Sequence, residues 1–233
     1  MDLITRRNLL ALLALPAGCS LQPLAPLKVS AGHMQTPLPQ VRAPAIGQSW
    51  RYTLLNYYNG NVLDTLKEEV TLVGPRITVQ RQSGQAGKLM DETHTRWGQV
   101  QQDPSWDLLQ IYETPMPLWL QPLQTGTTQS IDSHYTHASS SFRYWIQADI
   151  QVMGRETVDL AIGSFQTIRI EKRIRQTHYD NGKLFLQRRE TLWLAPETGR
   201  WVVRETDGGF RRAGKKLDEG REDHFRWELT AWT

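Results

Sequence analysis

Residues 168–177 read Ile-Arg-Ile-Glu-Lys-Arg-Ile-Arg-Gln-Thr, and residues 186–195 read Leu-Gln-Arg-Arg-Glu-Thr-Leu-Trp-Leu-Ala. Apolar and polar residues alternate in both stretches, which is typical of strands with one buried face. Asp180-Asn181-Gly182 lies between them and supplies the residues of a hairpin turn, with Gly182 in the left-handed region. The sequence therefore predicts an antiparallel hairpin.

The length of the turn determines which residues of the hairpin face one another. A three-residue loop brings the two apolar faces together, whereas a two-residue loop would set the isoleucines against polar residues. We therefore expect the three-residue loop. The expected pairs are Ile168 with Leu194, Ile170 with Leu192 and Lys172 with Glu190.

A second turn, Pro196-Glu197-Thr198-Gly199, follows directly and returns the chain for a third strand. We expect Trp201 to lie beside Leu194 and Val203 beside Leu192. The three strands then form a meander.

Period-two alternation recurs on both sides of this meander. The stretches that read as further strands are residues 50–55, 62–73, 77–81, 89–100, 142–152 and 225–231. Residues 102–140 differ, because four prolines interrupt their apolar pieces. Proline cannot donate to a sheet ladder, so we expect an irregular excursion there, with one or two short edge strands.

These patterns predict an all-β fold. Residues 47–233 should form one domain, a single antiparallel meander sheet curved into a half-barrel or an open barrel. Cys19 is the only cysteine, so the core must hold without a disulfide. Residues 1–46 are expected to carry no packed structure.

Residues 1–18 have the layout of a cleavable bacterial export signal. Arg6 and Arg7 precede the apolar run 9–15, and the small residues Ala17 and Gly18 follow it. The run is too short for a permanent membrane helix, which needs about 20 residues. Residues 5–10 also resemble a twin-arginine signal, so the export route stays open.

Leu15-Pro16-Ala17-Gly18-Cys19 resembles the lipobox of bacterial lipoproteins, with Pro16 where an aliphatic residue is usual. The resemblance implies cleavage before Cys19 and acylation of its thiol, with palmitate among the acyl groups. Several acyl chains anchor a protein durably, at about 0.8 kcal/mol per methylene. The alternative is ordinary cleavage that leaves a free thiol. Ser20, in place of the Asp of an inner-membrane retention signal, implies the outer membrane and a domain that faces the periplasm.

Residues 19–46 contain five prolines among small and polar residues. This composition favours extended conformations over packed structure. We expect a tether that could hold the domain several tens of Å from the membrane, at about 3 Å per residue.

Three motifs in the second half resemble a domain-of-unknown-function family of Gram-negative envelope proteins. They are residues 154–158 (Gly-Arg-Glu-Thr-Val), 162–170 (Ile-Gly-Ser-Phe-Gln-Thr-Ile-Arg-Ile) and 193–199 (Trp-Leu-Ala-Pro-Glu-Thr-Gly). Ser164 and Leu194 stand where the family has Thr and Tyr. The resemblance implies an antiparallel β architecture, similar to the curved half-barrel of periplasmic lipoprotein carriers. It implies no catalytic residue.

His134 and His137 are three residues apart, a spacing that could share a metal on a helical turn. A metal site needs further ligands and a fixed second shell. The Ser- and Thr-rich surroundings favour a loop instead. We predict no metal, no cofactor and no catalytic residue.

We therefore expect a lipid-anchored envelope protein that is not an enzyme and that binds an apolar ligand or an envelope protein on its concave face. One alternative is a periplasmic hydrolase or metal-dependent enzyme built on the His134/His137 loop, and another is a structural envelope component. Without residues 1–18 the net charge of +3 falls to +2, because two of 27 Lys and Arg and one of 24 Asp and Glu are removed. This near-neutral balance argues against nucleic acid as a partner.

Overall fold

The computed structural model describes residues 23–32, 39–138, 140–177, 183–212, 219–222 and 224–233. Within these ranges the regular elements are strands. They are β1 (Lys28–Ala31), β2 (Ser49–Asn56), β3 (Val62–Leu72), β4 (Ile77–Ser83), β5 (Gly87–Lys88), β6 (Glu92–Arg96), β7 (Gln99–Asp103), β8 (Gln110–Pro117), β9 (Thr128–His137), β10 (Ser140–Leu160), β11 (Gly163–Thr177), β12 (Lys183–Ala195), β13 (Arg200–Arg212), β14 (Glu219–Arg221) and β15 (Phe225–Trp232). None of the described residues belongs to a helix that could cross a membrane.

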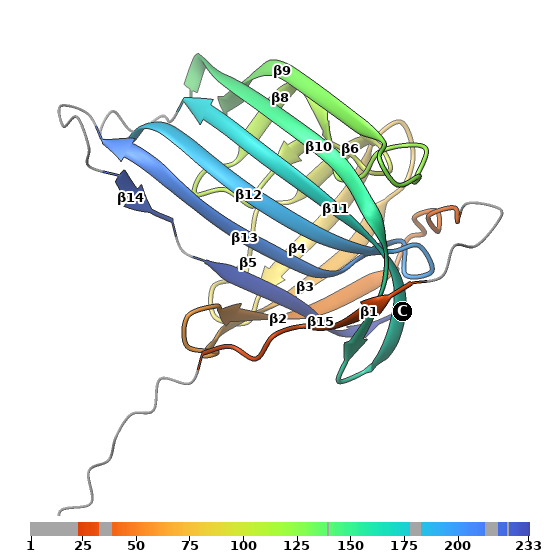
Figure 1. Cartoon of the computed structure of the whole chain (residues 1–233). Helices are drawn as coiled ribbons and strands as arrows, with labels where there is room; N and C mark the ends of the chain where they lie inside the picture. Colours follow the sequence, from red (N-terminus) through yellow and green to blue (C-terminus); the bar gives the residue numbers. More distant parts are fainter. Residues whose placement is uncertain (1–22, 33–38, 139, 178–182, 213–218, 223) are drawn as a thin grey trace, which may run out of the picture.

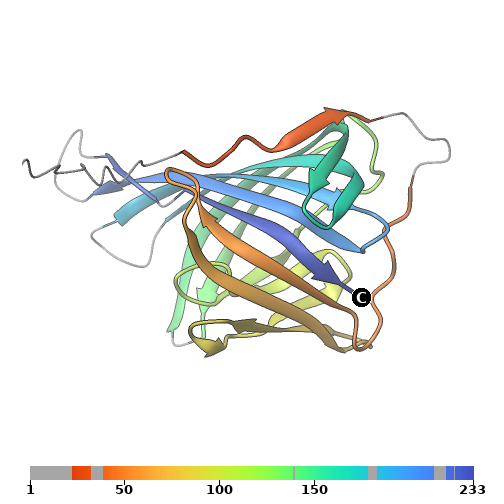
Figure 2. The same ribbon diagram turned by 90° about the horizontal axis from the view of Figure 1, so that it is seen from below.

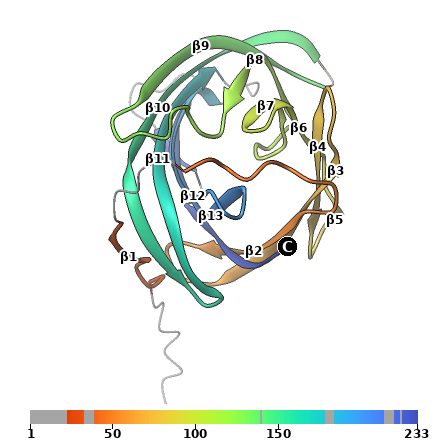
Figure 3. The same ribbon diagram turned by 90° about the vertical axis from the view of Figure 1, so that its right-hand side faces the viewer.

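Twelve strands form one antiparallel barrel (Figures 1 and 3). The order around the barrel is β10-β11-β12-β13-β15-β2-β3-β4-β6-β7-β8-β9, and β9 pairs with β10 to close it. The all-β prediction is confirmed. The barrel is closed, however, and not the half-barrel or open barrel that the sequence suggested.

The closure comes from residues 102–140, where the sequence predicted an irregular excursion. This stretch contains β8 and β9, and β9 has a neighbour on each side. Pro115 and Pro117 lie beyond the β8 residues that pair with β9, and the β7–β8 register shifts before them. Prolines are compatible with a sheet at such breaks in pairing.

The register of the central hairpin is confirmed, although the turn residues 180–182 lie outside the described part of the chain. The observed pairs include Ile168–Leu194, Ile170–Leu192 and Lys172–Glu190. In β13 the prediction is half right. Trp201 pairs with Leu194, but Val203 pairs with Trp193 and Arg204 with Leu192, because the register shifts at Val202. A bulge of this kind turns the following side chains to the other face.

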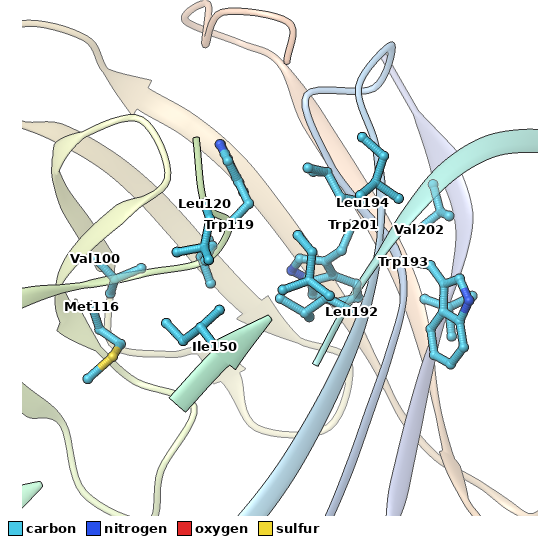
Figure 4. Packing of buried hydrophobic residues seen from close by; sticks show 14 of the residues in the cluster. Val100, Met116, Trp119, Leu120, Ile150, Leu192, Trp193, Leu194, Trp201 and Val202 are labelled. Atoms are coloured by element: carbon cyan, nitrogen blue, oxygen red, sulfur yellow. The ribbon is translucent and has the colours of Figure 1, made fainter. Parts of the chain in front are cut away.

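Alternate side chains of the barrel strands point into the lumen and fill it. Figure 4 shows Leu192 and Trp201 on the lumen side, with Leu120 opposite them. Tyr52, Tyr112 and Tyr135 are also buried, at 0, 2 and 0% exposed. The concave surface is therefore packed with side chains, and large apolar residues supply most of the burial that stabilises the fold.

The far part of the β10–β11 hairpin covers Trp193 on the outside of the barrel wall. The β10 register shifts between Val152 and Gly154, and the rest of the β10–β11 hairpin lies along the outer face of β12 and β13 (Figure 2). Trp193 is 7% exposed on that face, and its Nε1 donates to Glu156 at 2.7 Å. This hairpin therefore covers an indole that would otherwise face solvent.

Part of the expected tether is built into the fold. β1 pairs with Glu156–Asp159 of β10, and the carbonyl of Ala25 accepts a hydrogen bond from Arg226 Nη1 at 2.8 Å. Leu27 and Val41 pack against the core. Residues 23–32 thus run along the barrel, which differs from a free extended spacer.

The two ends of the barrel differ. At the closed end, residues 39–46 cross the opening (Figure 3), and Arg42 N donates to Pro196 O at 2.8 Å. Trp50 Nε1 and Trp97 Nε1 donate to the carbonyls of Thr198 and Gly199, at 3.0 and 3.1 Å. At the other end, which we call the mouth, lie the β2–β3 turn, the β7–β8 connection and the first residues of β10, β12 and β15 (Figure 1).

Candidate functional site

A cavity of about 220 Å³ opens at the mouth. Its walls come from β12, β13, β15, the β7–β8 connection and the residues around β14. The lining includes Ser105, Arg188, Phe210, Arg221, Phe225 and Trp227. We call it the mouth pocket. The carboxylates of Asp107 and Glu222 also line it, and Glu222 pairs with Arg188. The aromatic rings together with Arg221 suit a ligand with an apolar body and an anionic group.

Arg188 occupies a lumen-facing position of β12 and forms one wall. Its guanidinium carbon lies 3.6 Å from the ring centroid of Trp106, which is cation–π distance. Its Nε donates to Glu222 at 3.0 Å, and the two side chains are 12 and 13% exposed. Arg188 thereby joins the β7–β8 connection to the chain beyond β14.

Arg204 lies below the mouth pocket. Its Nη2 donates to Ser105 Oγ at 3.2 Å, and its guanidinium carbon is 5.6 Å from the ring centroid of Trp227. Arg204 also pairs with Glu190, which in turn accepts from Lys172. Its Nε has no hydrogen-bond partner among the described residues. A buried donor of this kind is the group that a ligand acceptor could satisfy.

The β7–β8 connection is positioned by Asp103. One carboxylate oxygen accepts from Tyr112 Oη at 2.9 Å and from Trp106 Nε1 at 3.2 Å. The other accepts from Ser105 N at 2.8 Å. Burial raises the pKa of the Tyr112 hydroxyl well above its usual value, and the Asp103 charge adds to this. The phenol therefore stays a donor at neutral pH and fixes the loop.

A second ion network fills the lumen nearer the closed end. Arg200 donates to Glu68 and, at 2.9 Å, to Glu92. His94 Nδ1 accepts from Gly98 N, which places a ring proton on Nε2, 2.7 Å from Glu92. Burial alone would raise the pKa of Glu92, but the charge of Arg200 and the His94 hydrogen bond hold it well below its usual value. Charged groups so deeply paired organise the interior and leave little room for a ligand there.

The two histidines singled out in the sequence do not converge. Residues 128–137 form strand β9, where residues three apart point to opposite faces, so the expected loop is wrong. His134 Nδ1 lies 3.3 Å from Arg143 Nη2 on the outside, while His137 Nδ1 lies 3.3 Å from Leu109 O on the inside. Within the described residues, no three His, Cys, Asp or Glu side chains form a metal-binding group. Cys19 lies outside the described residues.

The mouth pocket was not predicted from the sequence, although one signal for it exists. Arg188 has the same parity along β12 as Glu190 and Leu192, so the predicted register already places its side chain on the inward face. A charged residue at an inward position indicates a polar site in the lumen. The partners Trp106 and Glu222 come from segments whose pairing the sequence did not resolve.

No family model matches the chain, and no curated protein matches it. Solved bacterial structures share its fold. One, from Bacteroides fragilis, is described as an exported protein with a YmcC-like fold, and the two chains align with a TM-score of 0.54 and 11% identity over 84% of this chain and 99% of that one. Another, from Parabacteroides distasonis, is described as a lipoprotein, with a TM-score of 0.53 and 11% identity over 85 and 100% of the two chains.

A third structure, that of the lipoprotein YmcC from Escherichia coli, aligns less closely, with a TM-score of 0.41 and 11% identity over 78% of this chain and 83% of that one. At these identities the likeness shows the fold alone. The two structures from Bacteroides fragilis and Parabacteroides distasonis agree with the β architecture implied by the motifs around Gly154, Phe165 and Trp193.

Proposed function

We propose that this protein is a lipid-anchored binding module of the bacterial envelope, attached through acylated Cys19 in the outer membrane and facing the periplasm. It is not an enzyme, and it takes an amphipathic ligand, apolar in its body and anionic at one end, at the mouth pocket. The observation that carries the proposal is the arrangement of Arg188 on Trp106 beside the ring pair Phe225–Trp227, whose centroids are 5.8 Å apart.

The ligand site is the mouth pocket rather than the concave face that the sequence suggested. In the closed barrel that face is the lumen, and its side chains and ion pairs occupy it. Other hollows lie on the outer wall, such as the one beside Arg51, Lys67 and Gln82. That hollow is lined mainly by polar side chains, and the one beside Phe185 and Phe210 has about half the volume of the mouth pocket, at about 110 Å³.

The binding test uses the purified full-length protein and 1-anilinonaphthalene-8-sulfonate, a fluorescent apolar anion. We expect saturable binding that the Arg221→Gln variant weakens about tenfold, because a charge-assisted hydrogen bond contributes roughly 1.5 kcal/mol. Arg221 is exposed and lines the mouth pocket. Arg96→Gln is the matched control, since Arg96 is exposed on β6, away from this site.

Absence of saturable binding, or equal weakening by the control, would contradict the proposed ligand site. The anchoring is tested separately. Mass spectrometry should find acyl chains on the mature N-terminus, and Cys19→Ser should move the protein from the membrane fraction to the soluble periplasmic fraction. Wild-type protein that carries no acyl chain would contradict the anchoring.

A further inference from the structure

We propose that the short link after Cys19 holds the mouth of the barrel against the membrane, so that the mouth pocket opens toward the bilayer surface. The partner of the mouth is therefore the phospholipid headgroup layer in which the anchor sits. This inference rests on the anchoring at Cys19 proposed above.

The N-terminal segment is fastened to the barrel before it reaches the anchor. Arg226 Nη1 donates to Ala25 O at 2.8 Å, although Arg226 lies on the outer face of β15. Its Nε donates to Glu205 at 2.6 Å, and its guanidinium carbon lies 5.2 Å from the ring centroid of Tyr57. Arg226 is only 2% exposed. Because Glu205 and Tyr57 hold the Arg226 guanidinium in place, its hydrogen bond fixes the position of the Ala25 carbonyl on the barrel. We call this carbonyl the fixed point.

This fixed point lies at the mouth. Tyr57 belongs to the β2–β3 turn, where its ring stacks on His224 with centroids 3.7 Å apart and its N–H donates to His224 O at 2.9 Å. From Ala25 the chain runs away from the mouth into β1, which pairs with the far part of β10. Figure 1 shows the first described residues beside the end of β2. The anchor therefore connects to the mouth end of the barrel.

The link is too short to reach the closed end. Four residue steps separate Cys19 from Pro23, and even fully extended they span at most about 14 Å. Strand β3 alone has 11 residues between the two ends, or roughly 35 Å along the strand at about 3.3 Å per residue. An acylated Cys19 thus places the bilayer at the mouth, because Ala25 and β1, within the stretch expected to form the tether, are bound to the barrel.

The side chains at the mouth suit a lipid surface. Tyr58, Val62 and Phe142 are 50, 63 and 72% exposed there, and tyrosine is enriched where proteins meet lipid headgroups. The closed end also exposes apolar residues, including Ile46 at 69% and Leu72 at 48%. Exposure therefore does not distinguish the two ends. The position of the anchor does.

The test places one fluorescent label at each end of the full-length lipidated protein. Tyr58→Cys reports on the mouth, and Leu72→Cys is the matched control at the closed end. An acylated Cys19 has no free thiol, so the label attaches only to the new cysteine. The protein is inserted into phosphatidylethanolamine–phosphatidylglycerol vesicles that contain a lipid with a nitroxide quencher on its headgroup. We expect loss of fluorescence at position 58 and little loss at position 72.

A second variant carries an insert of about 15 Gly and Ser residues between Ser20 and Leu21, a flexible coil with a root-mean-square length of roughly 20 Å. The loss of fluorescence at position 58 should shrink, since the mouth is then free to leave the surface. Equal or greater quenching at position 72, or quenching at position 58 that the insert leaves unchanged, overturns the inference while the proposed function stands. Protein whose Cys19 carries no acyl chain overturns both the anchoring and this inference.

Discussion

Lys172 Nζ lies 2.8 Å from a carboxylate oxygen of Glu190, and both side chains are 3% exposed inside the barrel. The second oxygen of Glu190 pairs with Arg204. One buried carboxylate therefore balances two cations from neighbouring strands. Removal of one member of a buried ion cluster leaves a buried charge without a counterion. The cost of that uncompensated charge is larger than the net stabilisation that the intact cluster provides.

Glu190→Ala should lower the free energy of unfolding by about 3–5 kcal/mol, because both Lys172 and Arg204 lose their counterion. Lys172→Met should cost less, since Glu190 keeps Arg204. Urea denaturation followed by tryptophan fluorescence measures both. The control is Lys67→Met, whose pair with Glu69 is 37 and 35% exposed and should contribute about 0–1 kcal/mol. A control as costly as Glu190→Ala would contradict this account.

The same carboxylate predicts a pH dependence. Burial alone would raise the pKa of Glu190, but the charges of Arg204 and Lys172 outweigh burial and lower the pKa from 4.5 to about 2. The folded-state pKa lies below the unfolded-state pKa, so the unfolded chain binds the proton first as pH falls. The stabilisation, about 3 kcal/mol, is complete above the unfolded pKa and lost between about pH 4.5 and 2.

We therefore expect the urea midpoint to fall steeply from pH 5 to pH 3. In Glu190→Gln the fall should be shallower, because the variant has no proton to take up at this position. The remaining slope comes from other carboxylates, of which Glu92 also has a depressed pKa. Identical slopes for wild type and variant would show that Glu190 does not titrate in this range.

The sequence predicts the hairpin of β11 and β12 to the residue because two independent features agree there. The alternation fixes which face is buried, and the turn fixes the register. The same reasoning gives the wrong partner for Val203, because a bulge at Val202 shifts the register. Nothing in the apolar run 201–203 indicates the position of that bulge. The closure by β9 was missed because proline content is a local signal, whereas closure is a pairing between distant strands.

The candidate site was harder to predict. The inward position of Arg188 follows from the register, but its stacking on Trp106 depends on how residues 104–109 return to the mouth. Similarly, composition assigns residues 19–46 to a spacer, yet the carbonyl of Ala25 meets a guanidinium two hundred residues away in sequence. Such contacts depend on tertiary arrangement, which local patterns do not encode.

Arg200 gives a prediction about side-chain shape as well as charge. Its guanidinium contacts Glu68 and Glu92 at once, and the three side chains are at most 4% exposed. Arg200→Lys keeps the charge but loses the planar fork. We expect it to lower the free energy of unfolding by more than about 2 kcal/mol. Arg143→Lys is the control, because Arg143 also contacts a carboxylate, Glu113, but is 59% exposed and should cost under about 1 kcal/mol.

Thermal and urea unfolding of the two lysine variants, together with circular dichroism, would measure the difference. Equal destabilisation at both positions would indicate that the Arg200 network has no special geometric demand. Loss of the β-sheet spectrum in Arg200→Lys would be the strongest form of the expected result.

The last prediction concerns how the closed end is packed. Gly98 has φ +84°, and an added Cβ would lie 2.5 Å from the ring of Trp119. Trp119 is 4% exposed and meets Trp97 edge to face, with centroids 5.8 Å apart. Gly87 has a similar φ of +73° with nothing within 4 Å of an added Cβ.

Both Ala variants share the backbone strain, about 1–2 kcal/mol. Gly98→Ala should lower the free energy of unfolding further, because Trp119 must also be displaced. Urea midpoints measure the difference, and near-UV circular dichroism should change only for Gly98→Ala. Equal midpoints would mean that Trp119 moves at no cost and that the closed end is loosely packed.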